Sequence, residues 1–307
     1  MSLRQSLALA ASLLVLTPAA QAAQADEHRL SCASGMPDTA SSPIAPFKKH
    51  ADADALNVVG LTTDGRLVCF NERRPSRLQL IGTVSGLQVD TRLVGIDFRV
   101  QDGQLYGVGD AGGVYMLDTG HAQATLVNRL SMALSGNTFG VDFNPVADRL
   151  RIVSDTGQNL RHNVNAGGVT LLDGALNYTA GTSALGVAGA AYTNNDLSPA
   201  TPATTGTTLF VLDAALDQVA LQSPPNNGSL VPTGKLTVDG ATLTGFDIYS
   251  VVRGGVTVRN RALATLSAAD GSVGLYDINL LTGKATARGT LPSALTVMDI
   301  AVPLAQD

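Results

Sequence analysis

Four aspartates stand in the same local setting, each between two apolar residues: Asp97, Asp142, Asp247 and Asp299. A carboxylate in such a segment is buried on folding and costs several kcal/mol if it finds no partner. The four groups can converge on a cation such as Ca²⁺, which takes about six to eight oxygen ligands. Alternatively, each can accept hydrogen bonds from backbone N–H groups of a neighbouring segment. The repetition favours the structural role, because a catalytic set is usually asymmetric.

A second group of chemically capable residues lies in one polar stretch near the middle of the chain. Its cations and amides indicate a site for an anion or another polar ligand on one rim of the fold. The residues of this predicted rim site are Arg149, Arg151, Asn159, Arg161 and His162. The alternative is a set of solvated turns in which Arg149 or Arg151 pairs with Asp142 or Asp148.

The N-terminal region holds candidate ligands for a metal ion and one of the two cysteines of a candidate disulfide. Cleavage after Ala25 would leave Asp26-Glu27-His28 at the new N-terminus, where the amine, two backbone nitrogens and the imidazole suit Cu(II) or Ni(II). Cleavage after Ala22 would remove that site. The chain has two cysteines, Cys32 and Cys69, which an oxidising compartment would allow to pair. In the other interpretation, Cys69 is simply a small buried hydrophobic residue.

These residues must be positioned by strands, because the apolar residues alternate over short segments and no long segment has a helical period. The unit Gly-apolar-Asp-apolar, followed by a Leu-led apolar run and Asp/Gly turns, recurs about every fifty residues. A weaker copy lies at Gly186-Val187-Ala188, where the carboxylate is lost. Aligned on their second strands, the units begin at Leu56, Leu105, Leu150, Leu209 and Leu263. This pattern predicts an all-β fold, a β-propeller of four-stranded blades.

The ends of the repeat region predict how the propeller closes. The first unit lacks its Gly-apolar-Asp strand, whereas residues 296–302 form an extra copy of it. If this C-terminal strand joins the N-terminal three, five four-stranded blades close a ring without exposed sheet edges. Six blades are the alternative, with the leader or the insert at residues 194–208 supplying further strands.

The N-terminal segment indicates where the protein is located, and the net charge limits the partners that it can bind. Residues 1–25 resemble a secretory signal peptide, with Arg4 before an apolar stretch too short to cross a bilayer. Residues 26–54 are expected to be an extended leader and residues 55–307 a single propeller domain. The formal net charge of −5 argues against a nucleic-acid partner. Export to the periplasm or the exterior is therefore expected, without a membrane span.

Common catalytic signatures are missing from the sequence. It contains no G-x-S-x-G, H-E-x-x-H or C-x-x-C motif, and it has no tryptophan. Gly107-Val108-Gly109-Asp110-Ala111-Gly112 matches G-x-G-x-x-G, but a strand rather than a helix is predicted to follow, so dinucleotide binding is not expected.

Several blocks together resemble an exported bacterial family that is known only as a domain of unknown function and is thought to be propeller-like. The resemblance covers residues 55–302, implies no activity and assigns no catalytic residue. The blocks that carry it are Gly95-Ile96-Asp97-Phe98, Gly140-Val141-Asp142-Phe143-Asn144-Pro145, Gln158-Asn159-Leu160-Arg161, Ala191-Tyr192-Thr193-Asn194-Asn195 and Gly245-Phe246-Asp247-Ile248.

The sequence therefore favours a binding or scaffolding module of the cell envelope, with a protein or small-molecule ligand at the channel mouth or the rim site. The alternative is a Ca²⁺-dependent hydrolase of lactonase or glycosidase type with its site in the central channel. A hydrolase should direct a carboxylate from outside the repeated set into the channel with a raised pKa. A binding module should have every channel-facing acid hydrogen-bonded to backbone.

Overall fold

The computed structural model describes residues 55–196, 206–239 and 243–306. These residues belong to one compact unit of the chain. The predicted signal peptide (1–25) and leader (26–54), with Asp26, Glu27, His28 and Cys32, lie outside the described residues, and the predictions made for them stay predictions.

Five antiparallel sheets of four strands each are the main elements of the described chain. The first three sheets contain β22 (Val297–Ala301), β1 (Asn57–Thr62), β2 (Arg66–Asn71) and β3 (Gln79–Thr83); β4 (Leu93–Phe98), β5 (Leu105–Gly109), β6 (Gly113–Leu117) and β7 (Ala124–Arg129); and β8 (Phe139–Asn144), β9 (Arg149–Ser154), β10 (Asn159–His162) and β11 (Thr170–Leu172). The last two contain β14 (Val187–Tyr192), β15 (Leu209–Asp213), β16 (Gln218–Gln222) and β17 (Leu230–Lys235); and β18 (Thr244–Arg253), β19 (Val256–Ser267), β20 (Val273–Ile278) and β21 (Ala285–Thr290).

Two small elements lie outside these sheets. A hairpin of β12 (Asn177–Thr179) and β13 (Thr182–Ser183) follows the third sheet, and the short 3₁₀ helix η2 (Pro225–Asn227) lies between β16 and β17. Within the described ranges, the structure has no helix long and apolar enough to cross a membrane.

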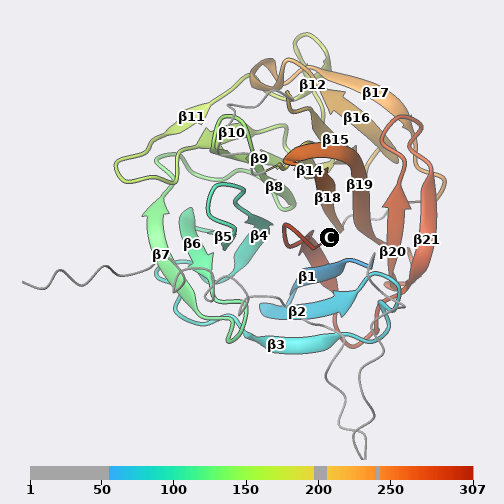
Figure 1. Cartoon of the computed structure of the whole chain (residues 1–307). Helices are drawn as coiled ribbons and strands as arrows, with labels where there is room; N and C mark the ends of the chain where they lie inside the picture. Colours follow the sequence, from blue (N-terminus) through green and yellow to red (C-terminus); the bar gives the residue numbers. More distant parts are fainter. Residues whose placement is uncertain (1–54, 197–205, 240–242, 307) are drawn as a thin grey trace, which may run out of the picture. The chain divides into compact units, whose positions relative to one another are not determined.

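The sheets are arranged as the blades of a five-bladed propeller (Figure 1). The innermost strands β4, β8, β14, β18 and β22 contact one another in that order, and β22 contacts β4 again, so the ring is closed. The closing strand β22 pairs with β1, where Asp299 lies opposite Leu61. The predicted five blades and their closure by the C-terminal strand are therefore confirmed, and the six-bladed alternative is wrong.

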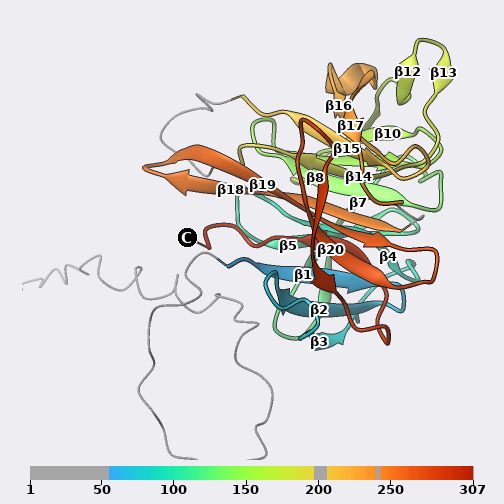
Figure 2. The ribbon, with the colours of Figure 1, turned by 90° about the vertical axis from the view of Figure 1, so that its right-hand side faces the viewer.

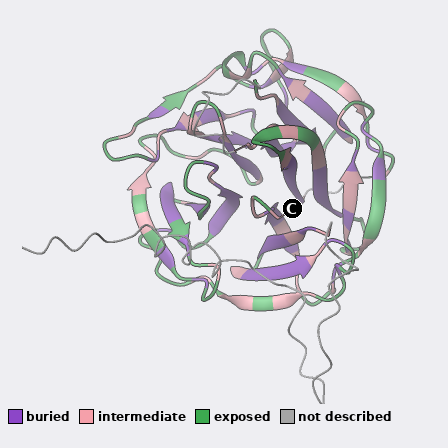
Figure 3. Ribbon diagram, viewed as in Figure 1, coloured by how far each residue is buried: buried purple, intermediate pink, exposed green. Residues whose placement is uncertain are grey.

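The sheets form where alternating segments are separated by residues that allow the chain to reverse. Between β1 and β2, for example, Gly65 has a φ of 78°, which a glycine adopts without steric cost. The inner strands are buried and the outer strands β3, β7 and β21 are more exposed (Figure 3). The core lies between neighbouring sheets: the rings of Tyr106 and Phe143 meet edge to face with centroids 5.2 Å apart.

The two ends of the ring axis are built differently. At one end the long hairpin of β18 and β19 projects from the same side as the C-terminus (Figure 2). There the side chain of Gln306 accepts a hydrogen bond from Asn57 N (2.7 Å), and the hydroxyl of Tyr249 accepts one from Gln306 N (2.9 Å). At the other end the innermost strands begin, and we call that end the mouth.

Candidate functional site

The repeated aspartates connect each innermost strand to the next one in the ring. The carboxylate of Asp97 accepts a hydrogen bond from Phe143 N at 2.7 Å, and that of Asp142 accepts one from Tyr192 N at 3.1 Å. The donors belong to β8 and β14, the following innermost strands. These two carboxylates therefore fasten the second sheet to the third and the third to the fourth.

The other two aspartates do the same across the closure of the ring. Asp247 accepts a hydrogen bond at 2.5 Å from Val302 N, directly after β22, and Asp299 accepts one at 2.8 Å from Ile96 N in β4. Each of the four carboxylates thus has a backbone donor in the neighbouring sheet, which is the structural arrangement expected from the repetition.

The fourth sheet lacks this fastener, but not at the position predicted from the sequence. Ala191 lies opposite Phe210, just as Asp97 lies opposite Tyr106, so the lost carboxylate belongs to Ala191 and not to Ala188. Asn195 takes over the connection, because its side-chain nitrogen donates to Ile248 O at 2.9 Å. The alignment on leucines also slips in the fifth sheet, where Leu263 lies opposite Asp247.

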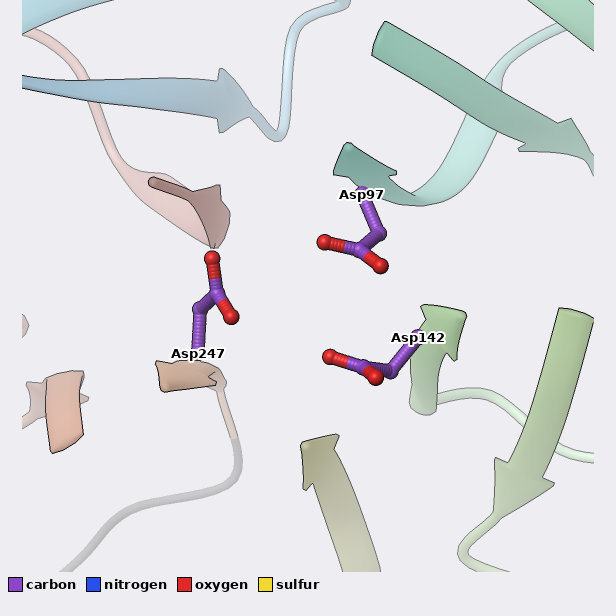
Figure 4. Close-up of side chains that lie close together, drawn as sticks. All are labelled: Asp97, Asp142 and Asp247. Carbon is purple, nitrogen blue, oxygen red and sulfur yellow. The ribbon is translucent and has the colours of Figure 1, made fainter. Parts of the chain in front are cut away.

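Three of the aspartates meet on the axis of the ring. Asp97, Asp142 and Asp247 each offer an oxygen that lies within 4.8 Å of those of the other two, and their carboxylates point toward a common centre (Figure 4). Asp299 is not part of this group. These carboxylates have the chemistry of a divalent-cation site, although three groups supply only part of the oxygen shell that Ca²⁺ takes.

Burial changes the acidity of all four groups. It raises the pKa of Asp97 and Asp142 well above the ordinary value, and the charges of neighbouring aspartates raise it further. Burial also raises the pKa of Asp299 well above its ordinary value, and that of Asp247 to about 6. Near neutral pH the cluster therefore holds protons or needs a compensating positive charge.

A pocket of about 720 Å³ lies at the mouth, where four of the innermost strands begin. We call it the mouth pocket. One wall is polar and comes from the second and third sheets, whereas the other is apolar and comes from the fourth and fifth. The polar residues are Arg92, Asn137, Thr138 and Asp155, and the others are Leu185, Gly186, Ala188, Ala214, Ala215 and Leu243.

The mouth pocket and the carboxylate cluster lie along the same strands. In β8 and β18 the aspartate lies three positions after the first residue of the strand, a rise of roughly 10 Å. The lining residues belong to connections and strand starts of four different sheets. No linear motif joins them, and sequence reasoning predicted the mouth as a location without naming them.

The residues of the predicted rim site are largely engaged inside the protein. Arg151 is only 2% exposed, and its guanidinium forms an ion pair with Asp173 at 2.7 Å and donates to Asn226 at 2.8 Å and to Asn159 at 2.7 Å. The pairing of Arg151 with Asp142 or Asp148 considered from the sequence is therefore wrong.

The remaining rim residues also have protein partners. Arg161 pairs with Asp173 at 2.8 Å, and Arg149 donates to the backbone oxygen of Asp148 at 2.7 Å. The imidazole of His162 is fully buried between Thr170 and Asn128, and burial lowers its pKa to about 4. The structure brings Arg151, Asn159 and Arg161 together around Asp173, while His162 lies in a separate contact. Ligand binding at this rim stays a prediction.

Cys69 of the predicted disulfide is buried in β2. Because its predicted partner Cys32 lies outside the described residues, the pairing also stays a prediction.

Several solved structures are similar to parts of this chain. A protein of unknown function from Bacteroides thetaiotaomicron has a TM-score of 0.43 at 12% identity, covering 75% of this chain and 55% of that one. Glutaminyl cyclase from Myxococcus xanthus has a TM-score of 0.37 at 15% identity, covering 68% of this chain and 69% of that one. An auxiliary nutrient binding protein from Bacteroides ovatus has a TM-score of 0.36 at 13% identity, covering 57% of this chain and 46% of that one. The chain thus spans about half the length of the first and less than half of the third.

No curated protein matches the chain. One family model does, over residues 66–301, which include strands of all five sheets. The chain therefore belongs to the family described as Domain of unknown function (DUF4394).

Proposed function

We propose that this protein binds a small molecule in the mouth pocket and acts as a binding module rather than as an enzyme. The observation that carries the proposal is the pocket itself, about 720 Å³ in volume and built from four of the five sheets. Pockets for small ligands measure about 300 to 1,000 Å³ and combine apolar walls with a few polar groups. The mouth pocket fits that description in size and in composition.

A Ca²⁺-dependent hydrolase of lactonase or glycosidase type is the alternative function. The close approach of Asp97, Asp142 and Asp247 favours it, because three carboxylates can hold a cation. Hydrolysis also needs a group that transfers protons. Within the described residues, the carboxyl groups with a raised pKa are the four repeated aspartates, and each accepts a backbone hydrogen bond from the next sheet. This arrangement supports binding.

A neutral fluorescent probe tests the proposal. Phenylnaphthylamine is apolar, and its emission rises when it leaves water for an apolar pocket. We expect saturable binding that Ala215→Trp weakens at least tenfold, because Ala215 lines the pocket. The matched control is Ala111→Trp, at an exposed position in the turn between β5 and β6, outside the pocket lining.

A second variant guards against an effect of misfolding. Leu185 is 63% exposed on the apolar wall, so Leu185→Asp should fold normally and should also weaken the probe. Binding that is absent in the wild type, or is unchanged in both pocket variants with normal unfolding midpoints, would contradict the proposal.

We also propose that the protein works in the cell envelope, on the strength of the signal-like residues 1–25. Expression of the full chain in a bacterial host, followed by N-terminal sequencing of the periplasmic fraction, tests this. Mature chains starting at Ala23 or Asp26 support export, and a chain retained in the cytoplasm with Met1 intact contradicts it.

A further inference from the structure

The two walls of the mouth pocket differ in a way that points to the chemistry of its ligand. The apolar wall offers the side chains of Leu185 and Leu243 and several alanines, so it suits a hydrocarbon or aromatic body. The polar wall carries one cation, Arg92, and one carboxylate, Asp155. Which of these charges is available decides the polar end of the ligand.

The guanidinium of Arg92 has no hydrogen bond or ion pair with any residue in the described ranges. Its charge helps to lower the pKa of Asp110, but the carboxylate of Asp110 already accepts hydrogen bonds from the hydroxyl of Thr91 at 2.5 Å and from Thr91 N at 2.8 Å. A guanidinium at the edge of an apolar pocket presents several N–H donors in a planar fork that matches an oxyanion.

The carboxylate of Asp155 is partly used by the protein. It accepts a hydrogen bond from Asn137 N at 2.9 Å, which ties the connection before β8 to the end of β9. The side-chain amide of Asn137 and the hydroxyl of Thr138, by contrast, make no hydrogen bond with another described residue. The polar wall therefore offers unused donors on Arg92, Asn137 and Thr138.

A second pocket of the described chain has arginines that are paired with acidic groups. That pocket, about 440 Å³, is lined by Arg261, Asp277 and Arg288 among others. There Arg288 pairs with Asp277, and Arg261 pairs with Glu72 at 2.5 Å. Its two arginines form ion pairs with acidic groups of the protein, whereas the guanidinium of Arg92 forms none with a described residue.

We propose that the ligand of the mouth pocket is an amphiphilic oxyanion. Its apolar body lies on the wall formed by Leu185 and Leu243, and its oxyanion is held by the Arg92 guanidinium. This inference rests on the proposed binding function and narrows it to molecules with a carboxylate, sulfonate or phosphate group on an apolar body.

A pair of probes with the same body separates the two proposals. Anilinonaphthalene sulfonate carries a sulfonate that phenylnaphthylamine lacks. We expect the sulfonate probe to bind the wild type more tightly, and Arg92→Gln to weaken it about tenfold while leaving the neutral probe within a factor of two, since a hydrogen bond to a charged group is lost. The control is Arg253→Gln, at the exposed tip of β18, which does not line the pocket.

A substitution of the carboxylate in the same wall tests whether a negative charge there opposes binding of the sulfonate probe. Asp155→Asn keeps an oxygen that can accept from Asn137 but removes a negative charge, so it should tighten the sulfonate probe about threefold. If neither probe binds to the wild type, the proposed binding function and this inference are both overturned. Suppose instead that both probes bind in the pocket, but that neither Arg92→Gln nor Asp155→Asn changes the affinity for the sulfonate probe. That result would overturn only the inference about the oxyanion.

Discussion

Asp97 and Phe143 lie 46 residues apart, in different sheets, yet the carboxylate of Asp97 accepts the backbone N–H of Phe143 at 2.7 Å. The contact is buried, so both groups depend on each other for a partner. The same relationship is repeated by the other three aspartates around the ring, which makes these side chains connections between blades.

This relationship predicts how two substitutions of Asp97 differ. Asp97→Ala removes the acceptor and leaves a buried N–H without a partner, so we expect a loss of about 1 to 3 kcal/mol in the free energy of unfolding. Asp97→Asn keeps an oxygen and removes a repelled charge, so its stability at pH 8 should equal or exceed that of the wild type. Urea unfolding measures both. An Asn variant as unstable as the Ala variant would show that the negative charge itself is needed, as a bound cation requires.

The raised pKa values predict a pH dependence of stability. In the folded protein Asp247 has a pKa of about 6 against an ordinary 3.8, so between these values the folded state binds more protons than the unfolded state. Stability must then fall as pH rises through this window, by about 3 kcal/mol for a shift of this size. The raised pKa values of Asp97, Asp142 and Asp299 act in the same direction, so these groups also make stability fall as pH rises.

Unfolding midpoints measured with chelator present from pH 4 to pH 8 check this dependence. Asp247→Asn should flatten the curve between pH 4 and pH 6, whereas Asp270→Asn, at a fully exposed position in a turn, should leave it unchanged. A stability that rises with pH over this range in the chelated protein would refute the argument.

The role of the cluster in cation binding can be measured directly. Because each carboxylate has a backbone donor, we expect EDTA to leave the unfolding midpoint of protein purified without chelator unchanged, and elemental mass spectrometry to find no stoichiometric metal. One Ca²⁺ per chain with a large loss of midpoint on chelation would instead place Asp97, Asp142 and Asp247 around an ion. Screening for hydrolase activity would then be worthwhile.

The buried position of Arg151 predicts a structural role within the predicted rim site. Arg151→Met should destabilise the protein by about 3 kcal/mol or more, because it removes a partner from the buried carboxylate of Asp173. Arg161→Gln is the matched control. It removes the more exposed cation from the same carboxylate and should cost less than about 1 kcal/mol. Equal losses in urea unfolding would argue against the distinction.

The sequence by itself determined that this protein is built from short strands and that the strands form five repeated units. Alternating segments and turn residues act over a few neighbours, so strands such as Leu93–Phe98 and the reversal at Gly65 could be predicted, and so could the closing strand around Asp299. The special character of the four aspartates was also visible, because the same local pattern recurs.

Only the tertiary structure decided which residues meet. The register of β14 placed the lost carboxylate at Ala191 instead of Ala188. The residues from Val187 to Ala191 are all small and apolar, so the sequence does not show which of them corresponds to the aspartates of the other sheets. It also placed Arg151 against Asp173, and it brought Arg92 and Leu185 into one pocket. Such contacts join residues from different sheets, and their geometry depends on how the sheets pack around the ring, which no local pattern records.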